Sequence, residues 1–173
     1  MLEVQILLGA FGLRMKSEAL KSADEFFMRK ALQEATTATS SEDVPVGAVI
    51  VLKNRVIARA CNQVELLSDA TAHAEMIAIT EAANLLKNKW LKDCVMYVTI
   101  EPCSMCAGAL VLSRISKVVF GASDPKAGAG GSVLNVLHHQ KLNHRIKVVG
   151  GILEKECAGI MKEFFRKQRA KEN

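Results

Sequence analysis

Ala72-His73-Ala74-Glu75 and Glu101-Pro102-Cys103-Ser104-Met105-Cys106 are the two stretches that decide how the rest of the chain is interpreted. They supply one histidine and two cysteines, which are typical zinc ligands, and a carboxylate that the metal does not need. A structural zinc site closes with four protein ligands, whereas a catalytic zinc keeps its fourth position for water. Because no fourth ligand stands at zinc-finger spacing, the two stretches predict a catalytic zinc site.

The length and composition indicate one soluble globular domain. The chain has 173 residues, of which 50% are hydrophobic and 24% are charged, values close to the average for globular proteins. Its net charge of +5 permits a polyanionic partner without requiring one. The five cysteines are an odd number and the motif uses two of them, so they favour a reducing compartment over a disulfide framework. We therefore expect a cytoplasmic protein.

The first residues raise the question of a targeting segment. Residues 2–13 are apolar, but no positive region precedes them, Glu3 is acidic and no small-residue cleavage pattern follows, which argues against a signal peptide. Every apolar stretch is shorter than the ~20 residues needed to cross a bilayer, so we expect no membrane span. Met15 offers an alternative start. We treat residues 1–16 as an N-terminal extension that need not be ordered, and residues 17–173 as a single domain.

Hydrophobic periodicity predicts helices that alternate with strands. Predicted helices cover residues 24–38 (capped at Ser22), 73–86, the segment that Pro102 opens, and 154–171, and predicted strands cover 46–52, 55–60, 95–100, 115–120 and 146–152. The first two strands form a hairpin, and the later ones need crossover connections, so part of the sheet should be parallel and covered on both faces. We expect an α/β fold of three α/β/α layers around a mixed sheet of about five strands.

The expected position of the two stretches explains how they could act. We expect His73 in the first turn of one helix, and Cys103 and Cys106 on one face of the first turn of another. If the two N-termini meet above the sheet, their dipoles favour thiolate ligands and hydroxide on the zinc. Glu75 can then take a proton from the zinc-bound water and pass it to a ring nitrogen and a leaving amine. The implied chemistry is hydrolytic deamination.

The motifs are similar to the His-x-Glu and Pro-Cys-x-x-Cys signature of the zinc-dependent nucleoside and nucleobase deaminases. From about Ser22 onward, the chain resembles the bacterial tRNA-specific adenosine deaminases along nearly its whole length. The segments that carry this resemblance are 44–49, Asn62, 71–75, 97–109, 119–122, 137–139, 143–145 and 164–166. The resemblance implies a cytidine-deaminase-like fold and conversion of adenosine to inosine at the wobble position of a tRNA anticodon. It also implies a homodimer with one zinc ion in each subunit.

Carried over residue by residue, the resemblance implies a role for each matching position. His73, Cys103 and Cys106 would bind zinc, and Glu75 would transfer protons. The expected contacts to the flipped-out adenine and the anticodon loop are Asn62, Asp124, Lys126, His139, Asn143 and Phe165. The glycine-rich loop 121–132 is variable, which leaves its path open.

Simpler explanations compete with several of these roles. On local sequence alone, Asn62 is more typical of a strand-end turn and Phe165 of a core-facing helix position. The basic run 166–171 is usual near a helix C-terminus, although RNA phosphates could also bind it.

Two other functions also remain open. One is a deaminase of a free base or nucleoside, of guanine or cytosine type. The other is a non-catalytic, zinc-stabilised RNA-binding module. Glu75 argues against the module, because a purely structural site has no use for a carboxylate beside an open coordination position.

Overall fold

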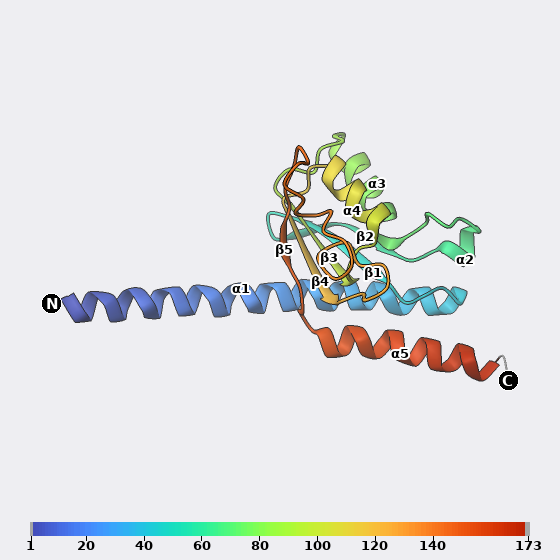
Figure 1. Cartoon of the computed structure of the whole chain (residues 1–173), viewed down its shortest axis with the longest axis horizontal. Coiled ribbons are helices and arrows are strands. Elements are labelled where there is room, and N and C mark those ends of the chain that lie inside the picture. The colour runs from blue at the N-terminus through green and yellow to red at the C-terminus, as the bar shows by residue number, and fades with distance from the viewer. Residues whose placement is uncertain (1, 172–173) are drawn as a thin grey trace.

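A mixed sheet of five strands lies between two layers of helices in the computed structural model (Figure 1). The structure describes the backbone of residues 2–171 and the side chains of residues 18 and 20–171. The strands are β1 (Gly47–Leu52), β2 (Arg55–Cys61), β3 (Cys94–Ile100), β4 (Lys117–Ala122) and β5 (Lys147–Val149), in the spatial order β2-β1-β3-β4-β5. β1 pairs antiparallel with β2 and β3, whereas β3, β4 and β5 run parallel. The predicted mixed α/β sheet is confirmed.

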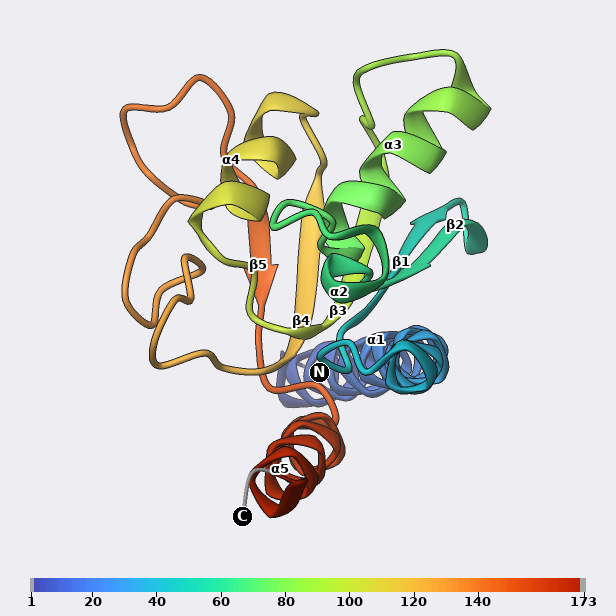
Figure 2. The ribbon, with the colours of Figure 1, turned by 90° about the vertical axis from the view of Figure 1, so that its right-hand side faces the viewer.

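Helices cover both faces of this sheet, as the strand pattern predicted. On one face lie α1 (Leu2–Ala38) and α5 (Glu154–Lys171), and on the other lie α3 (Ala74–Leu86) and α4 (Ser104–Leu112) (Figure 2). The short helices η1 (Thr39–Ser41) and α2 (Val64–Leu67) lie in the connections. Alternate residues of β1 serve two separate cores, because Ile50 packs on the α3–α4 side while Val49 packs against α1.

The first helix starts earlier than predicted. α1 begins at Leu2 and passes through Ser22, so the predicted N-terminal cap at that residue is wrong. Residues 2–21 contain no proline and many good helix formers, so nothing in the sequence stops the helix before Ser22. Its N-terminal half projects past the sheet (Figure 1). The division into an extension over 1–16 and a domain over 17–173 stays a prediction.

A buried polar contact and a close backbone approach hold α1 on the sheet. The Asp24 carboxylate, 5% exposed, accepts hydrogen bonds from the Tyr97 hydroxyl at 2.8 Å and from Lys117 Nζ at 2.7 Å. Burial and the contact with Asp24 raise the pKa of Tyr97. At Gly47, an added Cβ would lie 2.1 Å from the carbonyl oxygen of Ala31, so only glycine lets the helix approach the strand this closely.

The β1–β2 hairpin has the predicted two-residue turn. Lys53 and Asn54 both have positive φ angles, 48° and 60°, which is the type I′ geometry that matches strand twist. Within the described residues, no helix is both long enough and apolar enough to span a bilayer.

Candidate active site

Two helix N-termini bring the predicted metal ligands together. His73 immediately precedes α3, Cys103 immediately precedes α4, and Cys106 lies in the first turn of α4. The sequence had suggested that His73 and Cys103 lie inside the first turns of these helices. They are instead the N-cap residues that directly precede those turns. The Nδ1 atom of His73 lies 3.7 Å from Cys103 Sγ and 3.5 Å from Cys106 Sγ. All three ligand atoms lie within 4.8 Å of one another, so this group could hold a metal ion.

The surroundings of the two cysteines favour a thiolate at Cys103. Hydrogen bonds from the Cys106 thiol and from His73 lower the pKa of Cys103 to about 3. The hydrogen bond with Cys103, together with burial, raises the pKa of Cys106. The N-terminus of α4 also stabilises negative charge at Cys103. A thiolate is the form that binds a metal, so Cys103 is electrostatically prepared for one.

Glu75 lies beside this group but is not a member of it. Its side chain is 2% exposed and projects from the first turn of α3. Burial raises the pKa of the Glu75 carboxyl above its usual value, although its own backbone N–H and the His73 charge act in the opposite direction. A carboxyl group that gains and loses a proton closer to neutral pH is suited to general acid–base work.

The His73, Glu75 and Cys103 side chains line a cavity of about 280 Å³ at the carboxyl end of β3. Asn62 and Ile100 line other parts of its wall. Its volume lies just below the roughly 300–1,000 Å³ that is typical of ligand cavities, which suits a ligand as small as a single planar base.

Asn62 is held in one orientation by a residue that the sequence analysis missed. The Asn62 amide, 6% exposed, donates a hydrogen bond from Nδ2 to Asp43 Oδ1 at 3.1 Å. Asp43 is fully buried and also accepts from the backbone N–H groups of Glu65 and Leu66. A carboxylate only accepts hydrogen bonds, so the Asn62 nitrogen must face Asp43. No local signal marks Asp43, because its partners are 19 to 23 residues away.

Glu101, which precedes the cysteine motif, determines the path of the glycine-rich loop. Its carboxylate, 1% exposed, accepts from the backbone N–H groups of Asp124 at 3.0 Å, Gly130 at 2.9 Å and Ser132 at 3.0 Å, and also from the Ser132 hydroxyl. Burial alone would raise the pKa of Glu101, but these hydrogen bonds lower it. An added Cβ at Gly128 would lie 2.5 Å from this carboxylate, so the loop needs glycine there.

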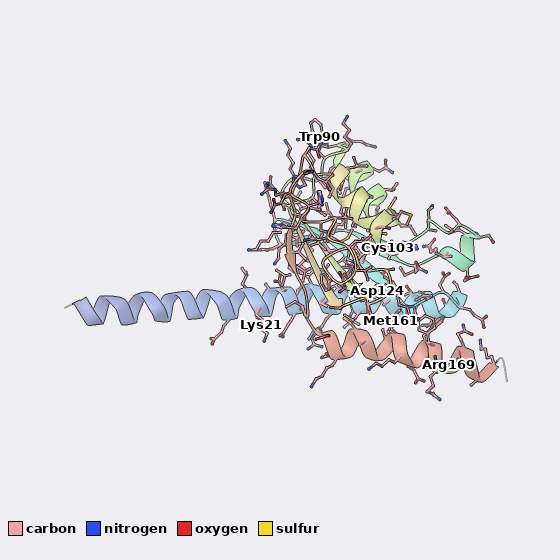
Figure 3. All side chains as sticks on the ribbon, viewed as in Figure 1. Lys21, Trp90, Cys103, Asp124, Met161 and Arg169 are labelled. Carbon is pink, nitrogen blue, oxygen red and sulfur yellow. The ribbon has the colours of Figure 1, made fainter. Side chains whose placement is uncertain are left out.

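Three of the predicted nucleotide contacts line a second groove next to the cavity. Asp124, Lys126 and Phe165 lie in a groove of about 580 Å³ between the 124–126 segment and α5. Asp124 also lines the cavity, so the two spaces adjoin. Figure 3 shows Cys103, Asp124, Met161 and Arg169 following one side of the molecule from the candidate metal site to α5. Arg169, from the basic run near the C-terminus, also lines this groove, together with Met161 and Lys162, which no sequence pattern marked.

His139 and Asn143 lie elsewhere. Both belong to the connection before β5, and neither lines the cavity or the adjoining groove. In this connection, His144 Nε2 donates to the carbonyl oxygen of Ile115 at 2.6 Å, just before β4 begins. His139 and Asn143 are therefore at the amino end of the parallel strands, whereas the cavity is at the carboxyl end. Within one chain, His139 and Asn143 are thus apart from the other predicted nucleotide contacts, which line the cavity and the adjoining groove.

Known proteins resemble this chain in sequence and in fold. A family model described as MafB19-like deaminase matches residues 22–169. The tRNA-specific adenosine deaminase of Bacillus subtilis (strain 168) is 49% identical over 148 residues, which are 86% of this chain and 92% of the relative. The enzyme of the same name from Aquifex aeolicus (strain VF5) is 51% identical over 84% of this chain and 95% of its own length.

Solved structures agree with these relatives. One, from a study of A-to-I editing by tRNA:A34 deaminases at the wobble position of transfer RNA, is 43% identical with a TM-score of 0.75, and covers 78% of this chain and 98% of its own. A guanine deaminase from Nitrosomonas europaea, at 23% identity over 81% of this chain and 83% of its own and a TM-score of 0.70, shares the fold. On the sequence, the fold and the site geometry together, the chain belongs to the family of bacterial tRNA-specific adenosine deaminases.

Proposed function

We propose that this protein hydrolyses adenosine to inosine at the wobble position of a tRNA anticodon. The observation that carries the proposal is the continuous path from a base-sized cavity, lined by Glu75 and by two of the three metal ligands, into a groove with cationic and aromatic side chains. A free base needs only the cavity, whereas a nucleotide within an RNA strand also needs a place for its neighbours.

We propose zinc as the metal, held by His73, Cys103 and Cys106. In a tetrahedral site with Zn–S near 2.3 Å and Zn–N near 2.0–2.1 Å, the ligand nitrogen and sulfur lie about 3.5 Å apart. The Nδ1–Sγ separations of 3.7 and 3.5 Å in the structure fit this value. The donor set of one imidazole and two thiolates also suits zinc better than a hard cation. When bound, zinc would supply a water molecule acidic enough to serve as a nucleophile near neutral pH.

The protein's own residues then account for the proton transfers and the orientation of the base. As water adds to C6 of the adenine, the Glu75 carboxylate accepts its proton and returns it to N1 of the ring. A second proton passes through Glu75 to the exocyclic nitrogen, the C6–N bond breaks, and inosine and ammonia leave. Asn62, oriented by Asp43, would bind a polar edge of the base, and Ile100 would contact its apolar face.

The adjoining groove would hold the nucleotides next to the target. Lys126, Lys162 and Arg169 can approach phosphates, and the exposed ring of Phe165 can stack on an unpaired base. By contrast, Arg166 pairs with Glu163 at 2.8 Å and Lys167 pairs with the same carboxylate at 3.5 Å. Within the basic run near the C-terminus, Arg166 and Lys167 therefore pair inside α5, Lys171 pairs with Glu42, and Arg169 lines the groove.

We further propose that two copies of the chain associate through the outer faces of α2, α3 and α4. Large apolar side chains on these helices, each more than half exposed, support this arrangement: Leu66, Leu67, Leu85 and Leu112. An apolar surface that is exposed on a single chain is usually buried in an interface with a partner. Light scattering of the purified protein, with Leu112→Glu as the variant expected to weaken the pair, tests this association. We place the homodimer in the cytoplasm, where its tRNA substrate is found.

One assay tests the function. Zinc-loaded protein is incubated separately with an anticodon stem-loop, free adenosine, guanine and cytidine, and the products are separated by chromatography. We expect inosine in the stem-loop and little conversion of the free compounds. Preferred turnover of guanine or cytidine would instead establish a free-base or nucleoside deaminase. Binding of the stem-loop without any product would favour a non-catalytic module. Glu75→Ala protein is the control for contaminating activity.

A further inference from the structure

The end of the sheet opposite the candidate metal site carries a concentration of positive charge. Three loops meet there, which we call the basic loop cluster: residues 87–93, 113–116 and 138–147. Backbone hydrogen bonds join them, because the Leu91 N–H donates to the carbonyl oxygen of Ser113 at 2.7 Å and the Lys147 N–H to that of Ser116 at 3.1 Å. The three loops therefore form one surface.

The charge of this surface exceeds that of the whole protein. The cluster contains seven Lys and Arg residues and a single acidic residue, Asp93, which gives +6 against +5 for the entire chain. The cations are Lys87, Lys89, Lys92, Arg114, Lys141, Arg145 and Lys147. All the rest of the chain together therefore carries a net charge of −1. Such segregation of charge creates a local positive potential that attracts polyanions.

Trp90, in the first of these loops, has three of these cations around its ring. The ring centroid is 5.2 Å from Lys89 Nζ, 5.3 Å from Lys92 Nζ and 4.9 Å from the Arg114 guanidinium carbon. The indole is still 39% exposed. Three like charges around one ring repel each other, and none of the salt bridges among the described residues involves them. An anion bound on this surface would relieve that repulsion.

We propose that the basic loop cluster is a second RNA-binding surface, which contacts tRNA phosphates outside the anticodon loop. The inference rests on the proposed function, which places the anticodon loop at the cavity, at the other end of the sheet. β3, which separates the two ends, has seven residues and spans roughly 20 Å at about 3.3 Å per residue. Phosphates bound at the cluster are therefore different from those next to the target base.

The side chains of the cluster fit this kind of partner. Exposed lysines bind phosphates as point charges without requiring a fixed geometry, and an exposed indole can stack on an unpaired base. His139 and Asn143, which the resemblance predicted to contact nucleotides, lie in the cluster and not in the cavity. A second RNA-binding surface would therefore account for their position as well.

The tryptophan provides a direct test, because Trp90 is the only one in the chain. Glu75→Ala protein, which should bind RNA without converting it, is titrated with full-length tRNA and, separately, with a short single strand of the anticodon-loop sequence. We expect tRNA to quench or shift the Trp90 fluorescence and the short strand to leave it unchanged. Equal changes with both RNAs, or no change while tRNA binds, would overturn the proposal.

Charge neutralisation provides an independent test with a matched control. The cluster variant combines Lys89→Gln, Lys92→Gln and Lys141→Gln, and the control variant makes the same change in charge at exposed residues elsewhere, with Lys21→Gln, Lys53→Gln and Arg55→Gln. Figure 3 shows how far Lys21 lies from Trp90. The thermal midpoints of both variants should equal that of the unmodified protein, because all six side chains are exposed.

For the cluster variant we expect the Kd for full-length tRNA to rise at least tenfold, and the slope of log K against log salt to flatten by about 2–3. Binding of the short strand should not change, and the control variant should behave like the unmodified protein. An equal loss in the two variants, or an equal loss with the short strand, would refute the proposal. So would cluster-dependent binding to phosphatidylserine vesicles without any effect on tRNA. Inosine formation by the unmodified protein is scored separately, so a failure of the proposed function can be distinguished from a failure of the second RNA-binding surface.

Discussion

The two ends of the parallel strands use polar residues in opposite ways. At the carboxyl end of β3, the side chains of Asn62, Glu75 and Glu101 are each no more than 6% exposed. At the amino end, Lys89 and Lys92 beside Trp90 are exposed and Arg114 is half-buried, and none of the three has a carboxylate partner among the salt bridges that the described residues form. The difference teaches that buried polar groups with several partners fix atoms in place, as chemistry requires. Exposed lysines supply charge without fixed geometry, which is enough to hold a phosphate backbone.

The largest effect should come from loss of a metal ligand at the carboxyl end. Cys103→Ala or Cys106→Ala should abolish both zinc binding and deamination, because two remaining protein ligands hold the metal weakly. Metal analysis of the purified variants checks this, with Cys61→Ala as a control that leaves the motif intact. Full zinc occupancy in either motif variant would mean that the ligands are wrongly assigned.

Replacement of the proton-transfer group should be nearly as severe but leave the metal in place. We expect Glu75→Ala to retain zinc and fold while deamination falls by about 10²–10⁴-fold, the usual contribution of a positioned general acid–base. Single-turnover assays on the stem-loop measure the chemical step directly. Normal turnover by this variant would exclude the proposed proton pathway.

A smaller loss is expected at the base-binding wall. Asn62→Ala leaves a polar edge of the bound base without its partner, at a cost of about 1–3 kcal/mol, or roughly a ten- to a hundredfold decrease in kcat/KM. Asp43→Ala should reproduce part of this loss, because Asp43 is expected to act by orienting Asn62. The double variant should therefore lose less than the sum of the two single variants. Fully additive effects would show that Asp43 does not act through Asn62.

The loop that Glu101 organises should respond mainly in substrate binding. Glu101→Gln replaces an acceptor oxygen with an amide that faces backbone donors, so we expect a loss of about 1–3 kcal/mol in stability and a rise in KM for the stem-loop. Thermal unfolding and steady-state kinetics measure the two effects. Glu25→Gln, the same change on α1, serves as the control and should alter neither.

The smallest effect is expected from the cations of the groove next to the cavity. Neutralising Lys162 and Arg169 together should raise KM severalfold, flatten its salt dependence and leave the rate at saturation unchanged, because phosphate contacts position the RNA without joining the chemistry. Neutralising Arg166 and Lys167, which pair with Glu163, should have less effect. If the two pairs were equivalent, the groove would have no special role.

Local sequence determined the elements and the reactive groups. The β1–β2 hairpin, the alternation of helices and strands, and α5 over Glu154–Lys171 could be predicted because periodicity and turn residues act over a few neighbours. The metal-ligand group could be predicted because its residues belong to short motifs, whose spacing fixes where the ligands lie at a helix N-terminus. The start of α1 could not, because Ser22 resembles a cap but nothing before it ends the helix.

Tertiary structure alone decided what surrounds those groups. Asp43 orients Asn62 across 19 residues, and Glu101 organises a loop that extends to Ser132, 31 residues away. His139 and Asn143 were predicted to help hold the nucleotides around the target base, yet the strand order places them at the end of the sheet opposite the cavity. Contacts of this kind depend on how distant segments pack, and a single sequence contains no local signal for them. The motif alone therefore predicts the chemistry of the site, whereas the walls of the cavity and the second charged surface depend on the tertiary fold.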